Sequence, residues 1–286
     1  MINLLLGKPV SDNIDIEIIE SIKELKNTGV FPRIAIVRIG ENSGDVFYEK
    51  AAMKKADKLG IACESIVLEK DVKQYELIGI IEKLNTDENI NGVLLLRPFP
   101  NEIDDDLIRN KLKSEKDIDG ITDSSLTGIL TVTNKGFSPC TAKACMEILD
   151  YYGYIIEGQN ITIIGRSLVI GKPLSLMMTN SNANVTVCHS RTKEEDLINY
   201  CKNSDIVVLA TGKTESFGSK FFKEDTVIID VGTGLGKNGN MAGDLDFEEV
   251  DKSVINIYAT PVPRGVGSVT TTVLMKNLIE ATKNPE

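Results

Sequence analysis

A turn with two glycines, between residues 160 and 174, is the first candidate for ligand binding. The run NITIIG leads into RSLVIGKPL, so a strand is expected to end at Gly165 and a helix to begin near Lys172, with a second glycine at Gly171. Such a strand-turn-helix directs backbone N–H groups and the positive end of the helix to one point, where a pyrophosphate can be held. The usual G-x-G-x-x-G spacing is not present, so a plain structural turn explains the pattern as well.

Polar residues in this turn and after the next expected strand narrow the choice of cofactor. Arg166 and Ser167 lie in the turn, and Ser190 and Arg191 follow the next strand. In dinucleotide-binding folds, the residue that contacts the ribose lies about as far along the sequence from the first glycine as Arg191 lies from Gly165. An acidic residue at this position binds the ribose 2′-hydroxyl of NAD, whereas an arginine accommodates the 2′-phosphate of NADP. The sequence has no acid there, which favours NADP. A solvated loop at Ser190 and Arg191 is the alternative.

A second group of candidate residues lies in the first half of the chain. Tyr48 stands in the first turns of an expected helix, where its ring can stack on a flat heteroaromatic ligand while its hydroxyl makes a polar contact. A partly buried helix residue is the simpler interpretation. Four lysines on the same helix, Lys50, Lys54, Lys55 and Lys58, are by themselves typical of a solvated face.

Two loops that follow expected strands could complete this second group. The segment KDIDG at residues 116–120 places two acids before a glycine, and RPFP at residues 97–100 follows a strongly apolar run. Loops at the carboxyl ends of parallel strands are where ligands bind in α/β proteins. Asp119 could accept two N–H bonds from a pterin-like ring, or it could only stabilise its own turn.

The elements that must position these residues alternate along the whole chain, as short β-branched runs and longer charged stretches with an apolar residue every three or four positions. This alternation predicts an α/β fold with parallel sheets, because strands that are apolar on both faces suit a sheet covered by helices on either side. The expected strands cover residues 33–39, 63–68, 92–96, 160–164, 184–188, 206–209, 226–229 and 255–258, and the expected helices cover residues 15–28, 44–59, 74–85 and 269–282.

The length of 286 residues matches two domains. Glycine- and proline-rich breaks at residues 126–141 and 261–267, the first followed by a helix from Thr141, predict where one domain ends and the other begins. A cofactor-sized domain of about 120 residues is then inserted between two other pieces of the chain.

Composition excludes several classes of protein. A net charge of −10 and a pI near 4.9 argue against a nucleic-acid partner. Five cysteines without a C-x-x-C pair argue against a disulfide framework and a structural zinc site, and fit a reducing, cytoplasmic compartment. A single histidine argues against a Ser-His-Asp triad or a histidine-rich metal centre. The apolar run at residues 2–6 is far shorter than the ~20 residues of a membrane span.

Nine motifs, in order along the chain, resemble those of the bifunctional methylenetetrahydrofolate dehydrogenase/cyclohydrolase family, and the resemblance runs from about Gly29 to the C-terminal helix. They are the Tyr48 helix ending in Gly60-Ile61, the run G-x-L-x-x-x-P-x-P at 92–100, KDIDG at 116–120, PCT at 139–141, IIGRSLVIGKPL at 163–174, VTVCHSRT at 185–192, DVG at 230–232, GDLDF at 243–247 and TPVPRGVGSVT at 260–270.

The resemblance implies a fold, a reaction and an assembly. Residues 1–138 with 268–286 would form an α/β folate-binding catalytic domain, residues 139–267 a Rossmann-like NAD(P)-binding domain, and the site would lie in the cleft between them. The implied reaction is hydride transfer from the one-carbon bridge of 5,10-methylenetetrahydrofolate to the nicotinamide of NADP⁺, which gives the methenyl cation. The protein's task is then mainly to hold two flat rings face to face. Family members are usually homodimers.

The resemblance also implies roles for individual residues. Tyr48 and Asp119 would be the catalytic residues, because Tyr48 would stack on the folate ring and Asp119 would hold the pterin by its amino edge. Further substrate contacts are implied at Pro98, Pro263, Gly265 and Val266. The implied NADP contacts are Thr141, Gly165, Arg166, Ser167, Gly171, Ser190, Arg191 and Gly232. No metal is implied.

Three positions depart from the family pattern. Members usually read Y-V-x-x-K, but here the position four residues after Tyr48 is Ala52; Leu96 replaces a common glutamine, and Arg264 stands where a glycine is usual. In the family that lysine and glutamine are linked to hydrolysis of the methenyl bridge, in which a water is activated and a leaving nitrogen is protonated. We therefore expect an NADP-dependent dehydrogenase that has lost most cyclohydrolase activity.

Three different functions are also compatible with these residues. The chain could remain fully bifunctional by using another lysine such as Lys55, one helical turn past Ala52, although its reach would differ by ~5 Å along the helix axis. It could be an NAD(P)-dependent dehydrogenase of another small acid, which the glycine turn alone would permit. It could also be a homologue that binds folate and NADP without turnover.

Overall fold

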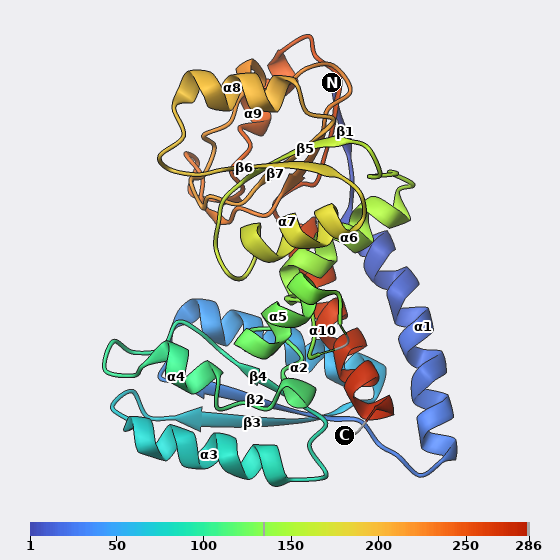
Figure 1. Ribbon diagram of the computed structural model, residues 1–286, viewed down its shortest axis with the longest axis vertical. Coiled ribbons are helices and arrows are strands. Elements are labelled where there is room, and N and C mark those ends of the chain that lie inside the picture. The colour runs from blue at the N-terminus through green and yellow to red at the C-terminus, as the bar shows by residue number, and fades with distance from the viewer. Residues whose placement is uncertain (134, 285–286) are drawn as a thin grey trace. The chain divides into compact units, whose positions relative to one another are not determined.

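The computed structural model describes residues 1–133 and 135–284. They divide into two compact units, each built on a parallel sheet (Figure 1). The six-stranded unit comprises residues 1–12 and 141–270, and the three-stranded unit comprises residues 13–140 and 271–286. Three helices, α1 (Gly7–Asn27), α6 (Cys140–Tyr151) and α10 (Val266–Lys283), contribute residues to both units.

The six-stranded unit has the strand order β1-β11-β8-β7-β5-β6, and every pair is parallel. Its strands are β1 (Ile2–Leu4), β5 (Asn160–Ile164), β6 (Asn184–Cys188), β7 (Ile206–Leu209), β8 (Val227–Asp230) and β11 (Ile257–Ala259). The chain passes from β5 outward to β6 and then returns to β7 on the other side of β5. This reversal creates a topological switch point beside the carboxyl end of β5, where doubly wound folds bind ligands.

Helices and short elements complete this unit. They are α6 (Cys140–Tyr151), α7 (Gly171–Asn180), α8 (Glu194–Lys202), α9 (Phe247–Lys252), a 3₁₀ turn η2 (Ser219–Phe221), and the small antiparallel pair β9 (Gly234–Leu235) and β10 (Met241–Ala242). All four residues of β7 and of β8 are buried, as expected for central strands of a sheet with both faces covered.

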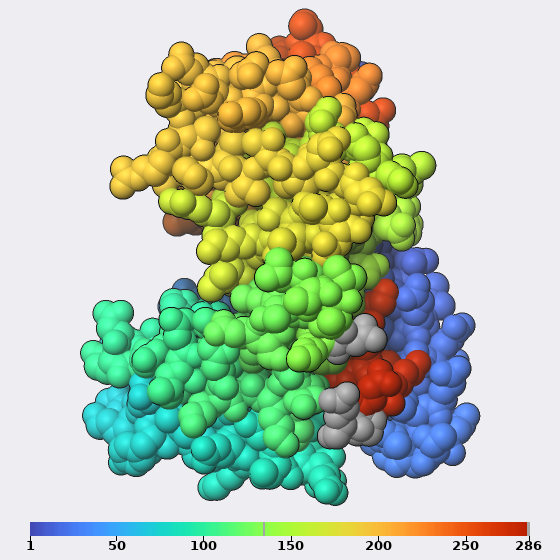
Figure 2. All heavy atoms as spheres, viewed as in Figure 1, coloured from blue at the N-terminus to red at the C-terminus, as the bar shows by residue number. Residues whose placement is uncertain are grey.

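The three-stranded unit has the order β3-β2-β4, again entirely parallel. Its elements are β2 (Arg33–Ile39), α2 (Ser43–Leu59), β3 (Ala62–Leu68), α3 (Gln74–Thr86), β4 (Gly92–Leu95), α4 (Asp105–Arg109), a 3₁₀ turn η1 (Ser114–Lys116) and α5 (Asp123–Thr131). Leu77 and Ile81 of α3 and Ile108 of α4 pack with Val37 and Leu95 of the sheet in one buried cluster. In the space-filling view, the cyan and green segments that include α3 and α4 form much of the visible surface of this unit (Figure 2).

The structure confirms the expected α/β class, the parallel sheets and each expected strand to within a few residues. The break expected from residue 126 is different, because α5 continues through Gly128 to Thr131. Gly128 serves close packing rather than a turn, since a Cβ there would collide with the carbonyl of Lys135. Among the described residues, no helix has the length and apolarity needed to cross a bilayer.

The observed units differ from the expected boundaries mainly at the N-terminus. Residues 1–12 were expected with the folate-binding domain, but they belong to the six-stranded unit because Ile2 of β1 pairs in parallel with Ile257 of β11. A pairing between residues so distant in sequence leaves no local signal in the sequence. The next boundary, between Cys140 and Thr141, lies two residues after the expected one.

Candidate functional site

The loop that carries Asp119 is held in place by the carboxylate of Asp117. Asp117 is fully buried, and its side chain accepts hydrogen bonds from the backbone N–H of Ile121 (3.0 Å) and Thr122 (2.8 Å) and from the hydroxyl of Ser125 (2.6 Å). These bonds close the loop around Gly120. The first acid of KDIDG is therefore structural, and it orients the second.

Gly120 and Asn277 constrain the same loop. Gly120 has a φ of +69°, and a Cβ there would collide with the carbonyl of Phe137, so only glycine fits. Asn277 of α10 is fully buried and donates to the carbonyl of Ile118 (2.8 Å). Asn277 was not predicted from the sequence, because a single polar residue in an apolar helix does not reveal which loop it contacts.

Asp119 and Tyr48, predicted to act together, lie close to each other in the three-stranded unit. Burial, together with the nearby Asp117 carboxylate, raises the pKa of Asp119 to about 7, against the opposing effects of a hydrogen bond from the Cys140 thiol and of the Arg97 charge. Burial also raises the pKa of the Tyr48 phenol, with added contributions from Asp119 and Cys140. Asp119 and Tyr48 are both partly exposed, so a carboxyl and an aromatic ring are available together to a ligand.

Helix α2 presents Tyr48 through defined ends and a buried ion pair. The Asn42 side chain caps the first turn by accepting from the N–H of Gly44 (2.8 Å), and Gly60 ends the helix with a φ of +68°. Next to Tyr48, Glu49 accepts from Arg38 of β2 (2.7 Å), and both of these side chains are buried. This pair fixes the helix against the sheet.

The two positions where the family pattern has a lysine and a glutamine are apolar and buried. Ala52 lies one turn after Tyr48 with no exposed surface, and Leu96, directly after β4, is 6% exposed. Lys55, the alternative source of an amine, is paired with the Asp15 carboxylate of α1 at 2.6 Å, and Lys58 contacts the same carboxylate at 2.8 Å. The lysines of α2 are thus not all a solvated face, since Lys55 belongs to a partly buried ion pair.

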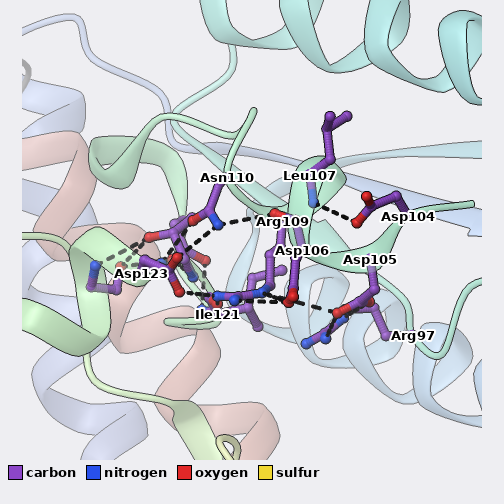
Figure 3. Close-up of polar contacts among 12 residues, drawn as sticks. Arg97, Asp104, Asp105, Asp106, Leu107, Arg109, Asn110, Ile121 and Asp123 are labelled. Atoms are coloured by element: carbon purple, nitrogen blue, oxygen red, sulfur yellow. Dashed lines mark hydrogen bonds and ion pairs between the residues drawn. The ribbon is translucent and has the colours of Figure 1, made fainter.

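A network of ion pairs joins Arg97, in the loop at residues 97–100, to α4 (Figure 3). Arg97 makes a two-pronged contact with Asp105, its Nε donating at 2.6 Å and its Nη2 donating to the second carboxylate oxygen. The buried Arg109 pairs with Asp106 (2.9 Å) and Asp123, and donates to the carbonyl of Ile121 at 3.2 Å. The network therefore ties α4 to the loop of Asp119. Pro98, predicted as a substrate contact, is exposed.

The glycine turn of the six-stranded unit is closely packed at both of its glycines. Gly165 has a φ of +141°, and a Cβ there would collide with the carbonyl of Ala210 after β7. A Cβ at Gly171, the first residue of α7, would collide with the carbonyl of Gly165. The Ser167 hydroxyl accepts from the N–H of Ile170 at 3.1 Å. Both glycines are required by close backbone packing at the switch point of the sheet.

The remaining predicted cofactor residues also belong to the six-stranded unit. Ser190 and Arg191 are exposed in the loop after β6, where the N–H of Arg191 donates to His189 Nδ1 at 3.2 Å. Gly232 is buried and lies two residues after the end of β8. Thr141 lies in the first turn of α6 and is partly exposed.

The proline-rich segment at residues 261–267 leads into α10. Arg264 has a φ of +84°, a left-handed conformation that favours glycine, and its carbonyl accepts from the N–H of Gly7 at 2.8 Å. Pro263 is exposed, whereas Gly265 and Val266 are buried. These predicted substrate contacts belong to the six-stranded unit, and Tyr48 and Asp119 to the three-stranded unit.

Comparison with known proteins matches both halves of the chain to one family. Residues 5–119 match the tetrahydrofolate dehydrogenase/cyclohydrolase catalytic domain, and residues 139–286 match the NAD(P)-binding domain of the same family. The bifunctional protein FolD of Alkaliphilus oremlandii is 42% identical over 281 residues, which cover 98% of this chain and 97% of that protein.

Solved structures agree with this match. The bifunctional methylenetetrahydrofolate dehydrogenase/cyclohydrolase of Campylobacter jejuni superposes with a TM-score of 0.94 at 34% identity, covering all of both chains. The Trypanosoma brucei enzyme, solved with NADP cofactor and an inhibitor, gives a TM-score of 0.91 at 30% identity and covers 98% of this chain and 97% of its own. The resemblance of the nine motifs is thereby confirmed, and the chain belongs to the tetrahydrofolate dehydrogenase/cyclohydrolase family.

Proposed function

We propose that this chain oxidises 5,10-methylenetetrahydrofolate to the methenyl form with NADP⁺ and has lost most of the cyclohydrolase activity of its family. The observation that carries the second part is that Ala52, one turn after Tyr48, and Leu96, directly after β4, are buried and apolar. The residues suited to binding a flat folate ring are present, while those suited to hydrolysis are absent.

The six-stranded unit has residues that fit a dinucleotide. Gly165 and Gly171 lack the side chains that would fill the turn, and exposed Arg166, Ser190 and Arg191 offer donors and positive charge to phosphates. When bound, NADP⁺ supplies the acceptor for the hydride. Ser167, Thr141 and Gly232 stay further predicted contacts, and Arg191 is the predicted partner of the 2′-phosphate.

The three-stranded unit has residues that fit the substrate. Tyr48 would stack on the pterin ring, and the ionised Asp119 would accept two N–H bonds from its amino edge. Both residues position the ring, because the hydride step needs alignment of two rings and no proton transfer. Pro98, Pro263, Gly265 and Val266 stay predicted substrate contacts.

Hydrolysis of the methenyl product makes demands that these side chains do not meet. A water must lose a proton as it attacks, and the leaving nitrogen must gain one. Ala52 and Leu96 have no group that exchanges protons or donates a hydrogen bond. The ammonium of Lys55 is held by the Asp15 carboxylate at 2.6 Å, which argues against its serving as a substitute.

Two absorbance assays test the proposal. Purified protein should form NADPH from methylenetetrahydrofolate and NADP⁺, but should clear methenyltetrahydrofolate no faster than buffer does. The double variant Ala52→Lys/Leu96→Gln should then clear the methenyl form faster than either the wild type or the single variant Leu96→Gln. Rapid clearance by the wild type would contradict the loss, and would favour a fully bifunctional enzyme that uses another lysine.

The NADPH assay also distinguishes a non-catalytic homologue from a dehydrogenase of another substrate. Binding of folate and NADP without any NADPH formation would indicate the homologue, and turnover of a different small acid would indicate the other dehydrogenase. A homodimer in the cytoplasm is part of the proposal, and light scattering of the purified protein measures the oligomeric state directly.

A further inference from the structure

Asp244 is a buried carboxylate that holds a loop at the carboxyl edge of the six-stranded sheet. The side chain has no exposed surface, and its Oδ2 accepts from the backbone N–H of Thr211 (2.6 Å), from the Thr211 hydroxyl (2.8 Å) and from the backbone N–H of Gly212 (3.2 Å). Thr211 and Gly212 follow β7 directly after Ala210. One oxygen of Asp244 therefore fixes the loop that leaves this strand.

The same loop packs against the glycine turn. A Cβ at Gly165 would collide with the carbonyl of Ala210, and a Cβ at Gly171 would collide with the carbonyl of Gly165. Close packing therefore continues from the loop that Asp244 holds to the first residue of α7. A helix start of this kind is where a fold with this topology binds the phosphates of a dinucleotide.

The second oxygen of Asp244 faces the loop after β8. A Cβ at Gly232 would collide with Asp244 Oδ1, so this glycine packs directly on the carboxylate. Among the described residues, Oδ1 has no hydrogen-bond donor. A buried acceptor without a donor costs free energy of folding, so stability alone does not explain a carboxylate at this position.

The backbone of Asp244 is itself held in place. The carboxylate of Asp230, at the end of β8, accepts from the N–H of Asp244 (3.1 Å) and from the N–H of Gly232 (3.0 Å). The Asp244 side chain thus starts from a fixed backbone and contacts the loops after two neighbouring parallel strands. The carboxyl ends of such strands are where ligands bind in doubly wound folds.

We propose that Asp244 is a positioning residue for the dinucleotide, which holds the loops after β7 and β8 so that the turn at Gly165 and the buried Gly232 keep the relative positions that NADP⁺ needs. This inference rests on the proposed function for the identity of the ligand. Asp244 acts through these loops, because its own side chain has no exposed surface with which to contact a ligand.

Calorimetric titration of the purified protein with NADP⁺ tests this role. Asp244→Asn keeps the size of the side chain but removes its charge, and hydrogen bonds to a charged acceptor are stronger than those to a neutral one. The dissociation constant for NADP⁺ should therefore rise by about tenfold. The KM for methylenetetrahydrofolate at saturating NADP⁺ should stay near the wild-type value. An unchanged dissociation constant would overturn the proposal.

Variants of Thr211 test the same contact if Asp244→Asn does not fold. Thr211→Val removes only the hydroxyl donor from a partly exposed side chain, and should raise the dissociation constant for NADP⁺ by about threefold. Thr211→Ser keeps the hydroxyl and should keep the wild-type affinity. Equal affinities in the valine and serine variants would contradict the role of Asp244.

Asp246, two residues further along the chain, provides the matched control. Its side chain caps α9 by accepting from the N–H of Glu249 (3.1 Å) and pairs with Lys237 (2.6 Å), between β9 and β10. Asp246→Asn removes the same charge from the same segment and should leave the affinity for NADP⁺ unchanged. A loss of affinity equal to that of Asp244→Asn would indicate a general effect of charge or folding, against the proposal.

The outcome separates this inference from the proposed function. A wild type that does not bind NADP⁺ contradicts the function itself. A wild type that binds NADP⁺ no more tightly than Asp244→Asn does contradicts only the role of Asp244.

Discussion

Two aspartates, one in each unit, share a pKa raised to about 7 by burial, yet their surroundings differ. Asp230, at the end of β8, has no exposed surface and accepts from the backbone N–H of Gly232 (3.0 Å), Asp244 (3.1 Å) and Leu245 (2.9 Å). Asp119 is partly exposed. The groups that shift its pKa are side chains rather than backbone N–H groups, and among them the Cys140 thiol donates a hydrogen bond.

The difference distinguishes a structural carboxyl from one that is available to a ligand. Asp230 is surrounded by chain, since a Cβ at Gly243 would collide with its Oδ2 and one at Gly232 would collide with the neighbouring Asp244 carboxyl. Its hydrogen-bonding capacity is used by the loops that it holds. Asp119 is partly exposed, so a ligand can reach its carboxyl, and a raised pKa alone does not identify a functional acid.

Substitution of Asp119 should have the largest effect on activity. Asp119→Asn replaces an acceptor with an amide that carries two donors, and should lower kcat/KM for methylenetetrahydrofolate by at least about a hundredfold, because two hydrogen bonds to a charged acceptor contribute about 1.5–3 kcal/mol each. The urea midpoint should change little. Steady-state kinetics and urea unfolding measure these two quantities. A wild-type kcat/KM in Asp119→Asn would contradict the role of Asp119 in binding the substrate.

Substitution of Asp230 should mainly affect stability. Asp230→Asn turns one acceptor toward the backbone N–H of Leu245 into a donor, which should lower the free energy of unfolding by about 1–3 kcal/mol. The KM for methylenetetrahydrofolate should stay near the wild-type value in variant enzyme that is folded. Urea unfolding measures the free energy of unfolding of Asp230→Asn, with Asp119→Asn as the matched control. Equal destabilisation by the two variants would contradict it.

The pH dependence of the free energy of unfolding should also distinguish Asp230. Burial raises the folded-state pKa of Asp230 from 3.8 to about 7, so the folded protein binds this proton more tightly than the unfolded chain does. Its contribution to stability is therefore complete below about pH 4 and is lost as the pH rises through 7. Unfolding free energies between pH 4 and 8 should fall less steeply in Asp230→Asn, and a slope equal to that of the wild type would exclude this assignment.

Much of the fold could be predicted from local pattern. Alternation of apolar and charged runs located eight strands of the two sheets, because β-branched residues and short apolar runs indicate buried parallel strands wherever they lie. The strand at residues 2–4 was missed, since its pairing with β11 joins opposite ends of the chain. The turn at Gly165 and Gly171 was also predicted, because a close approach of two backbone segments leaves no room for a Cβ and therefore requires glycine.

The candidate site could also be predicted only in part from the sequence. Residue types at Tyr48, Asp119, Ala52 and Leu96 can be read without coordinates, and they already favour a dehydrogenase over a hydrolase. Whether Lys55 is available cannot be read, because its partner Asp15 lies on another helix.

The sequence alone determined the α/β class, the family and the absence of a lysine at position 52, since these depend on residue identity and spacing. Only the tertiary structure decided which acid is structural and which lysine is already paired. The physical reason is that charge and burial depend on distances between segments, and the chain order does not contain those distances.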